Sequence, residues 1–148
     1  METCVEFEPE CREQMAGLAY MYDTGNYYLL VKTREEEYGS PCLDLAKPAS
    51  LRLIRSSHFD TSDVVPSIPI PEKGRLYLRV ITVNEGLNAK FFYSLDGENY
   101  IELAEVPTNI LTDEQSEGFT GAHFGMYCHD MTGGRKWGDF DYFEILRK

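Results

Sequence analysis

Two stretches near the C-terminal end decide the fold: FTGAHFGMYC at residues 119–128 and WGDFDYFEI at residues 137–145. Both are rich in aromatic residues and punctuated by glycine, a composition that costs an α-helix free energy but suits a pleated strand. Because side chains alternate across a strand, Phe124, Met126 and Cys128 share one face of the first stretch. We therefore expect sheet at this end, with one apolar and one amphipathic face.

Strand and turn signals recur along the rest of the chain. Segments 18–22 and 27–32 flank a turn that contains Gly25 and Asn26, and this pattern predicts a hairpin. Asp96-Gly97, between segments 89–93 and 99–103, predicts a second hairpin, because Asp-Gly supplies the positive φ angles of a tight turn. Further strands are expected at residues 5–8, 51–54 and 76–83, the last of them central because it is apolar on both faces.

The segments between the strands are short and polar or rich in proline. Pro66, Pro69 and Pro71 exclude a helix from the connector between His58 and Gly74 and confine any strand there to an edge. The acidic run 34–39 is interpreted as a solvated turn. The only helix expected is one turn within residues 109–116, capped by Thr112 with Gln115.

Eight or more strand signals with almost no helix predict an all-β fold. We expect a single domain, residues 1–148, built as a two-sheet antiparallel jelly-roll sandwich. A hydrophobic content of 43% in 148 residues suffices for one core without a metal or disulfides and excludes intrinsic disorder.

The charge of the chain limits its partners. The net charge is −11, and the 14 basic residues are scattered singly, which argues against nucleic acid and against an anionic membrane as partners. A neutral sugar, a metal cation or another protein remain as partners. Cys4, Cys11, Cys42 and Cys128 have no zinc-type spacing and the N-terminus has no secretory signal, so we expect free thiols in a cytoplasmic protein without a membrane span.

Catalytic and metal sites receive little support from the residues. With 25 acidic residues, no carboxylate pair stands out as the acid and base of a glycosidase. Cys128, His129 and Asp130 are neighbours on a strand and cannot meet as a triad, and the histidines lack zinc spacing. Structural calcium is the remaining metal hypothesis, with ligands from the alternating Asp139 and Asp141 or from Glu6, Glu8 and Glu10.

Aromatic residues are the candidates for binding sugar, because a ring can stack on the apolar face of a sugar. The candidates are Tyr20, Tyr22, Tyr27, Tyr28, Tyr38, Tyr93, Tyr100, Tyr127 and Trp137. Most of these rings must pack in the core, and Tyr127 and Trp137 are kept as sugar-stacking candidates. Phe119 lies between Gly118 and Thr120-Gly121, so its ring is either presented on a loop or tucked under the end of the sheet.

Six segments in this order give the chain a specific resemblance to one family. They are VEFEP (5–9), QMAGL (14–18), IPIP (68–71), YSLDGE (93–98), FTGA (119–122) and GDFDYF (138–143). The chain resembles the C-terminal concanavalin A-like β-sandwich domain of glycoside hydrolase family 43 β-xylosidases over nearly its whole length. The resemblance implies that a five-bladed catalytic propeller and the first strands of the sandwich, which would precede Val5, are missing from this chain.

The resemblance also implies a function. In that family the sandwich is not catalytic; it packs on the propeller, and the loop matching residues 118–122 places its phenylalanine, here Phe119, beside the active-site pocket. We therefore expect an accessory domain for the breakdown of xylan or xylo-oligosaccharides, not an enzyme by itself. A stand-alone xylan-binding module is the alternative, and an independent glycosidase is far less favoured. Missing strands would leave a sheet edge open to a second copy or to a propeller-bearing partner.

Overall fold

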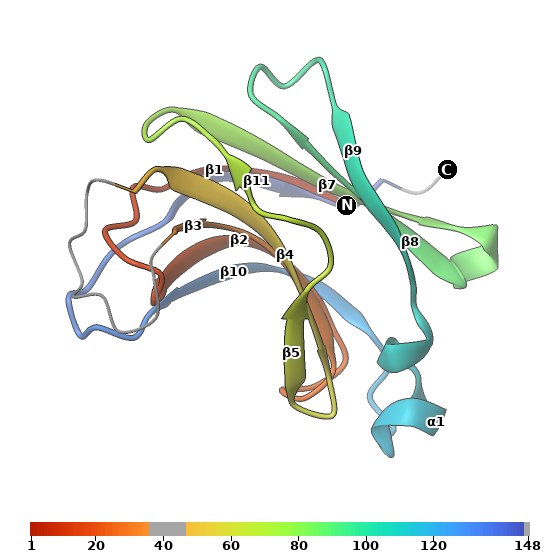
Figure 1. The fold of residues 1–148 in the computed structure, drawn as a ribbon. Coiled ribbons are helices and arrows are strands. Elements are labelled where there is room, and N and C mark those ends of the chain that lie inside the picture. The colour runs from red at the N-terminus through yellow and green to blue at the C-terminus, as the bar shows by residue number, and fades with distance from the viewer. Residues whose placement is uncertain (36–46, 147–148) are drawn as a thin grey trace.

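The computed structural model describes residues 1–35 and 47–146, which fold into two facing antiparallel sheets (Figure 1). Sheet A contains, in spatial order, β11 (Asp139–Glu144), β1 (Glu2–Glu6), β7 (Arg75–Val83), β8 (Asn88–Ser94) and β9 (Ile101–Pro107). Sheet B contains β10 (His123–Asp130), β2 (Gln14–Met21), β3 (Tyr27–Arg34), β4 (Ala49–Ser57) and β5 (Asp60–Asp63), with the short β6 (Ile68–Pro69) paired to β4. The predicted all-β sandwich is confirmed.

Both predicted hairpins form, because each turn satisfies its own backbone. In the β2–β3 turn the Asp23 carboxylate accepts the N–H groups of Gly25 and Asn26, both at 2.8 Å. In the β8–β9 turn the Asp96 carboxylate accepts two backbone N–H groups and the Asn99 amide, and these hydrogen bonds lower the pKa of Asp96. The strand at 76–83 is β7, and it occupies the predicted centre of sheet A.

The core lies between the two sheets. Residues at alternate positions of β2, β3 and β4 face those of β7 and β8, so Leu18, Leu30, Leu53, Leu78 and Phe91 are all fully buried. Burying each such side chain stabilises the fold by roughly 1.5–3 kcal/mol before entropy is counted. The hydroxyl of buried Tyr28, in this layer, has a partner: it donates to the carbonyl oxygen of Pro107 at 2.9 Å.

The connector at 58–74 holds no helix, and its two short strands agree with the prediction: β5 is an edge strand, and β6, which contains Pro69, pairs only with β4 among the described strands. Two other local predictions need correction. The helical turn is split into η2 (Asn109–Leu111) and α1 (Asp113–Ser116), and the Thr112 hydroxyl donates to the Asn109 carbonyl instead of capping α1. The expected apolar face of β10 is partly open to solvent, because Met126 is half exposed and Cys128 is exposed.

Part of the acidic run lies outside the described residues, and so do Tyr38 and Cys42. Arg34, where that run begins, is a buried residue at the end of β3 and not part of a solvated turn. Cys4 is a buried free cysteine, Cys11 is buried, and Cys128 is an exposed free cysteine. No helix within residues 1–35 and 47–146 is both long enough and apolar enough to cross a lipid bilayer.

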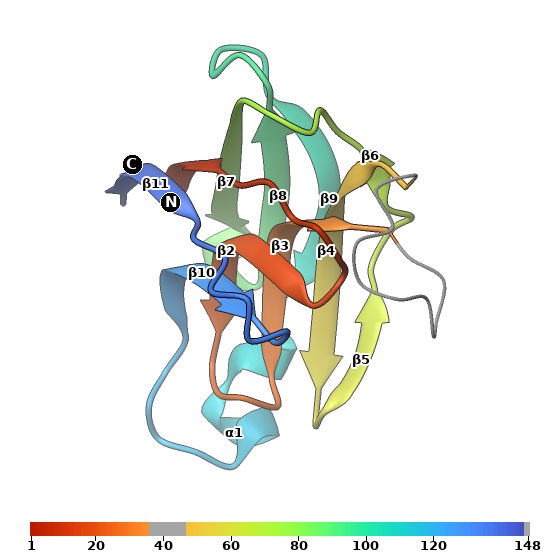
Figure 2. The ribbon, with the colours of Figure 1, turned by 90° about the vertical axis from the view of Figure 1, so that its left-hand side faces the viewer.

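The sandwich has two distinct ends (Figures 1 and 2). The β2–β3 turn, the β4–β5 turn, α1 and the loop 117–122 lie at one end, here named the Phe119 end. The β8–β9 turn and the loop 131–138 lie at the other, named the Trp137 end. The antiparallel register places the start of β10 at the Phe119 end, where His123 faces Met21, and its last residue, Asp130, opposite Gln14 at the Trp137 end.

Candidate functional site

The loop that joins α1 to β10, residues 117–122, presents Phe119 to solvent. The Phe119 side chain is 97% exposed, so the ring is presented on the loop and is not tucked under the sheet. The chain enters and leaves this loop through left-handed backbone at Glu117 (φ 54°) and Gly121 (φ 72°). An exposed aromatic residue on a loop points to an interaction, because its burial by a partner would remove apolar area from water.

Tyr22, which directly follows β2, holds this loop in place. The residue is buried, and its hydroxyl donates to the Asp113 carboxylate of α1 and accepts the backbone N–H of Thr120 at 3.2 Å. Gly118 lies against the ring, because a Cβ at position 118 would stand 2.7 Å from the Tyr22 hydroxyl oxygen and 2.8 Å from Cε1. Only glycine allows this approach, and the loop on either side of Phe119 is therefore fixed.

Tyr127 lies on the outer face of sheet B, where it is half buried. Its hydroxyl oxygen is 2.5 Å from Nδ1 of His129, and the two rings meet edge to face at 5.3 Å between centroids. Tyr127 packs against a small apolar cluster that includes Leu29 and Val31, and burial raises the pKa of its hydroxyl. Tyr127 is therefore a packing residue on the outer face of sheet B, and part of its side chain stays exposed.

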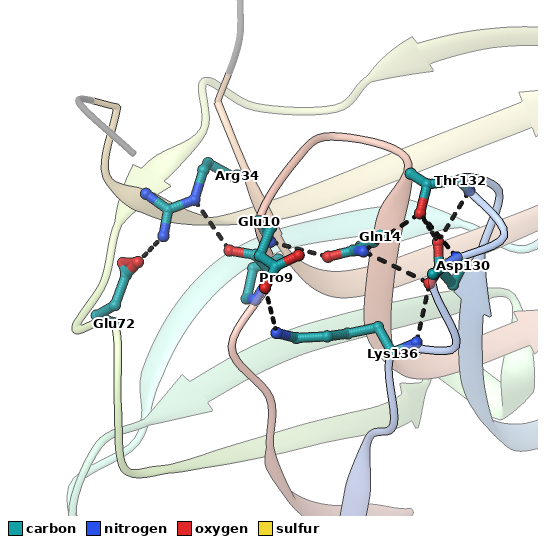
Figure 3. Close-up of polar contacts among 9 residues, drawn as sticks. Pro9, Glu10, Gln14, Arg34, Glu72, Asp130, Thr132 and Lys136 are labelled. Atoms are coloured by element: carbon teal, nitrogen blue, oxygen red, sulfur yellow. Dashed lines mark hydrogen bonds and ion pairs between the residues drawn. The ribbon is translucent and has the colours of Figure 1, made fainter. Parts of the chain in front are cut away.

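Trp137 is 82% exposed in the loop 131–138, whose base is fixed by Asp130 (Figure 3). The Asp130 carboxylate accepts the Thr132 hydroxyl at 2.6 Å and the backbone N–H groups of Thr132 and Lys136, both at 2.8 Å. These hydrogen bonds lower the pKa of Asp130 to about 2. The Lys136 ammonium in turn contacts the carboxylate of Glu10 at 3.1 Å. Trp137 is thus presented at the opposite end of the sandwich from Phe119.

The calcium candidates Asp139 and Asp141 are exposed on β11. Asp141 lies 3.5 Å from the Arg75 guanidinium, and Glu6 lies 3.3 Å from it, so both carboxylates have a cationic partner. Within residues 1–35 and 47–146 no three His, Cys, Asp or Glu residues gather in a way that could hold a metal ion. Structural calcium stays a prediction.

A groove of about 650 Å³ opens beside the first residues of β1 and the end of β7. Glu2 is the one carboxyl group among its described lining residues, and it accepts Arg79 Nε at 2.7 Å and the Tyr142 hydroxyl at 2.5 Å. Burial would raise the pKa of Glu2, but these hydrogen bonds outweigh it and lower the pKa. A glycosidase acid needs a raised pKa and a second carboxylate across the cleft, and this groove offers neither.

The two open sides of the sandwich differ in chemistry. At one side β5 is an edge strand whose residues, Asp60–Asp63, are all polar and exposed. At the other side β10 is the edge, and Met126, which pairs with core residue Leu18, is 50% exposed on the face toward sheet A. Charged edges resist pairing with another chain, whereas apolar ones invite it.

The structure therefore scatters the predicted site residues. Gly118, Phe119, Thr120 and Gly121 form one anchored loop, Tyr127 lies at mid-strand, Trp137 lies at the far end, and Asp139 and Asp141 lie on the other sheet. Sequence reasoning grouped Tyr22 with the candidate sugar platforms and missed its anchoring role. A separation of 91 residues between Tyr22 and Asp113 leaves no local signal for that contact.

Comparison with known proteins agrees with the fold. The family model described as the β-xylosidase C-terminal concanavalin A-like domain matches residues 1–146. A β-xylosidase of Bacillus subtilis (strain 168) is 34% identical over 154 residues, which cover 99% of this chain and 27% of that protein. Xylosidase/arabinosidase 43B of Humicola insolens is 30% identical over 148 residues, which cover 96% of this chain and 26% of that protein.

Solved structures show the same relation. The crystal structure of xylan β-1,4-xylosidase from Bacillus halodurans C-125 superposes with a TM-score of 0.81 and 26% identity, covering 95% of this chain and 26% of that one. The chain spans about a quarter of the length of the curated relatives that it matches. A match of the family model over residues 1–146 leads to one conclusion: the chain belongs to the family of β-xylosidase C-terminal concanavalin A-like domains.

Proposed function

We propose that this chain is a non-catalytic accessory domain that docks on the catalytic domain of a β-xylosidase-type glycoside hydrolase and shapes its substrate pocket with Phe119. The anchored Phe119 loop is the observation that carries the proposal. A ring that is 97% exposed stands on a loop whose flanking residues are fixed by buried Tyr22. The family membership and the greater length of the relatives support a catalytic domain as the partner.

The physical role of Phe119 follows from its chemistry. A phenylalanine ring can form a wall of a pocket and exclude water, but it cannot donate or accept a proton in the reaction. Because Tyr22 and Gly118 already order the loop, docking loses little conformational entropy there. The catalytic carboxylates would come from the partner domain, with xylose-containing substrates suggested by the names of the relatives.

The arrangement of the aromatic residues favours docking over a xylan-binding module. A binding groove for sugar would hold two or three outward rings in line. Here Tyr127 is half buried against His129, and Trp137 lies in the loop after β10, at the opposite end of that strand from the Phe119 loop. Xylo-oligosaccharide binding by the isolated chain is therefore the result that would favour the module.

A hybrid enzyme tests the proposal. The segment of the Bacillus subtilis β-xylosidase that matches this chain is replaced by this chain, and hydrolysis of a chromogenic xyloside is measured. Phe119→Ala in the hybrid should lower kcat/KM about tenfold, which corresponds to about 1.4 kcal/mol of lost transition-state stabilisation. Leu95→Ala, which removes a half-exposed side chain at the Trp137 end, is the matched control and should change nothing.

Stability of the isolated chain separates a pocket role from a packing role. Phe119→Ala should leave the melting temperature unchanged, because removal of an exposed loop ring costs little stability. Equal kcat/KM for Phe119→Ala and Leu95→Ala in an active hybrid would refute the proposed role of Phe119.

A further inference from the structure

Phe59, in the turn between β4 and β5, is a second exposed aromatic residue at the Phe119 end. Its side chain is 76% exposed. Ser57 pairs with Asp60, so His58 and Phe59 form a two-residue turn, and both have left-handed backbone, with φ of 51° and 67°. Turns of this kind favour Asn-Gly or Asp-Gly, and a bulky aromatic residue at positive φ is a genuine outlier. Strained backbone of this kind tends to persist at functional sites.

The turn is held in this conformation by the β2–β3 turn beside it. The Phe59 backbone N–H donates to the Gly25 carbonyl at 3.1 Å, and the His58 N–H donates to the Asn26 side-chain oxygen at 3.1 Å. The buried Ser56 hydroxyl also donates to the Gly25 carbonyl, at 2.8 Å. The Phe59 ring lies against Gly25, where an added Cβ would stand 3.0 Å from ring atom Cε2. The ring is thus fixed in position yet exposed.

The same β2–β3 turn connects Phe59 to the Phe119 loop. The Tyr22 backbone N–H donates to the Asn26 carbonyl at 3.0 Å, while the Tyr22 side chain binds Thr120 and packs against Gly118. Phe59 and Phe119 therefore stand on two segments that are fixed to one common turn. Both views of the fold place the β4–β5 turn and α1 at the same end of the sandwich (Figures 1 and 2).

The charge at this end indicates the chemistry of the partner. Asp60 directly follows Phe59, and Glu114 and Glu117 lie in the segment just before Phe119; all three are exposed, in a chain whose net charge is −11. A partner surface that matches it would be apolar where the rings insert and basic at its rim.

We propose that Phe59 and Phe119 belong to one docking surface, which the catalytic domain covers with an apolar, basic-rimmed face. The inference rests on the proposed function and extends it. Phe119 reaches the substrate pocket, whereas Phe59 is an anchor of the domain interface that does not touch substrate. A few aromatic anchors generally contribute most of the binding energy of an interface.

Photocrosslinking in the hybrid enzyme tests the anchor directly. Phe59 is replaced by p-benzoylphenylalanine, the hybrid is irradiated, and the crosslinked peptides are identified by mass spectrometry. We expect crosslinks from position 59 to peptides of the catalytic part. Leu95 replaced in the same way is the control at the opposite end and should give none.

The stability of the isolated chain provides a second measurement. Phe59→Gly should leave the melting temperature equal or higher, because glycine adopts a positive φ without steric cost. On this proposal the ring contributes to binding the partner and not to the stability of the isolated chain. A fall of more than about 4 °C would show instead that the ring stabilises the turn itself, and the proposal would be wrong.

The outcomes separate this inference from the proposed function. If Phe119→Ala lowers kcat/KM in the hybrid but position 59 crosslinks only within its own domain, the anchor is refuted and the accessory function stands. If the hybrid is active and insensitive to Phe119→Ala, the proposed function fails whatever position 59 contacts. Crosslinks from positions 59 and 95 alike would show non-specific contact and would also refute the anchor.

Discussion

At the scale of single residues, Tyr22 determines whether Phe119 is presented. Its hydroxyl is shared between the Asp113 carboxylate and the Thr120 N–H, and its ring supports Gly118. A buried hydrogen bond typically contributes about 1 kcal/mol net, and one to a charged group contributes more. Both hydrogen bonds act on the loop and on α1, so their loss should increase the mobility of residues 117–122 more than that of the two sheets.

Tyr22→Phe tests this role, because it removes the hydroxyl and keeps the ring on Gly118. We expect the amide groups of residues 117–122 to exchange hydrogen faster, with about 1–2 kcal/mol lost from the free energy of unfolding. Tyr93→Phe, in β8, is the matched control, because it removes the hydroxyl of another buried tyrosine residue. Unchanged exchange in the loop would show that Tyr22 does not anchor it.

Lys32 is a second residue whose position has a measurable consequence. Its side chain is 1% exposed on β3, and its ammonium donates to the Glu72 carbonyl at 2.8 Å. Burial lowers the pKa of Lys32 to about 8, although nearby Glu8 acts in the opposite direction. The unfolded chain keeps a pKa near the ordinary value of 10.5, so between about pH 8 and 10.5 the unfolded state binds more protons.

Stability should therefore rise with pH in that window. The contribution of Lys32 to the free energy of unfolding should increase by up to about 3 kcal/mol between pH 8 and pH 10.5. Urea denaturation of the wild type and of Lys32→Met at several pH values measures it, since tyrosine titration affects both proteins alike. Parallel pH profiles for the two would contradict the lowered pKa.

At the scale of elements, the edge strand β10 differs from the edge strand β5. β5 carries four exposed polar residues, whereas β10 exposes Met126 on the face that turns toward sheet A. Pairing through β10 with a second copy or with another polypeptide remains a prediction from this difference.

Met126→Lys tests the edge, because an inward-pointing charge on an edge strand opposes pairing. If the isolated chain associates through β10, light scattering should show a smaller mass for this variant at the same concentration. Ser62→Lys on β5 is the control and should leave the mass unchanged. A monomeric wild type would show that the β10 edge does not pair between copies.

Elements specified by neighbouring residues were predictable from the sequence, and contacts between distant segments were not. Asp96-Gly97 and the Gly25-Asn26 turn set their hairpins through local hydrogen bonds, so both were found. The exposure of the Met126 side chain depends on the position of β10 at the edge of sheet B, which is a property of the assembled sheet. Phe119 was identified as a candidate site residue from its flanking glycines and the family resemblance. The sequence contains no local signal for Phe59, because its positive φ depends on hydrogen bonds to Gly25 and Asn26.

At the scale of the whole molecule, the sandwich is a rigid frame with different groups at its two ends. Two sheets with a continuous core hold Phe59 and Phe119 at one end and Trp137 at the other. Relatives of about four times this length combine such a domain with further chain, which supports the accessory role proposed above.

The most direct test of this account is hydrolysis of a chromogenic xyloside by the isolated chain, followed with and without xylo-oligosaccharide as competitor. We predict no hydrolysis above the rate without protein, because Glu2, the carboxyl group in the described lining of the 650 Å³ groove beside β1 and β7, is paired with Arg79 and Tyr142. Saturable turnover that copurifies with the chain would contradict the account, since this polypeptide would then contain a reaction centre of its own.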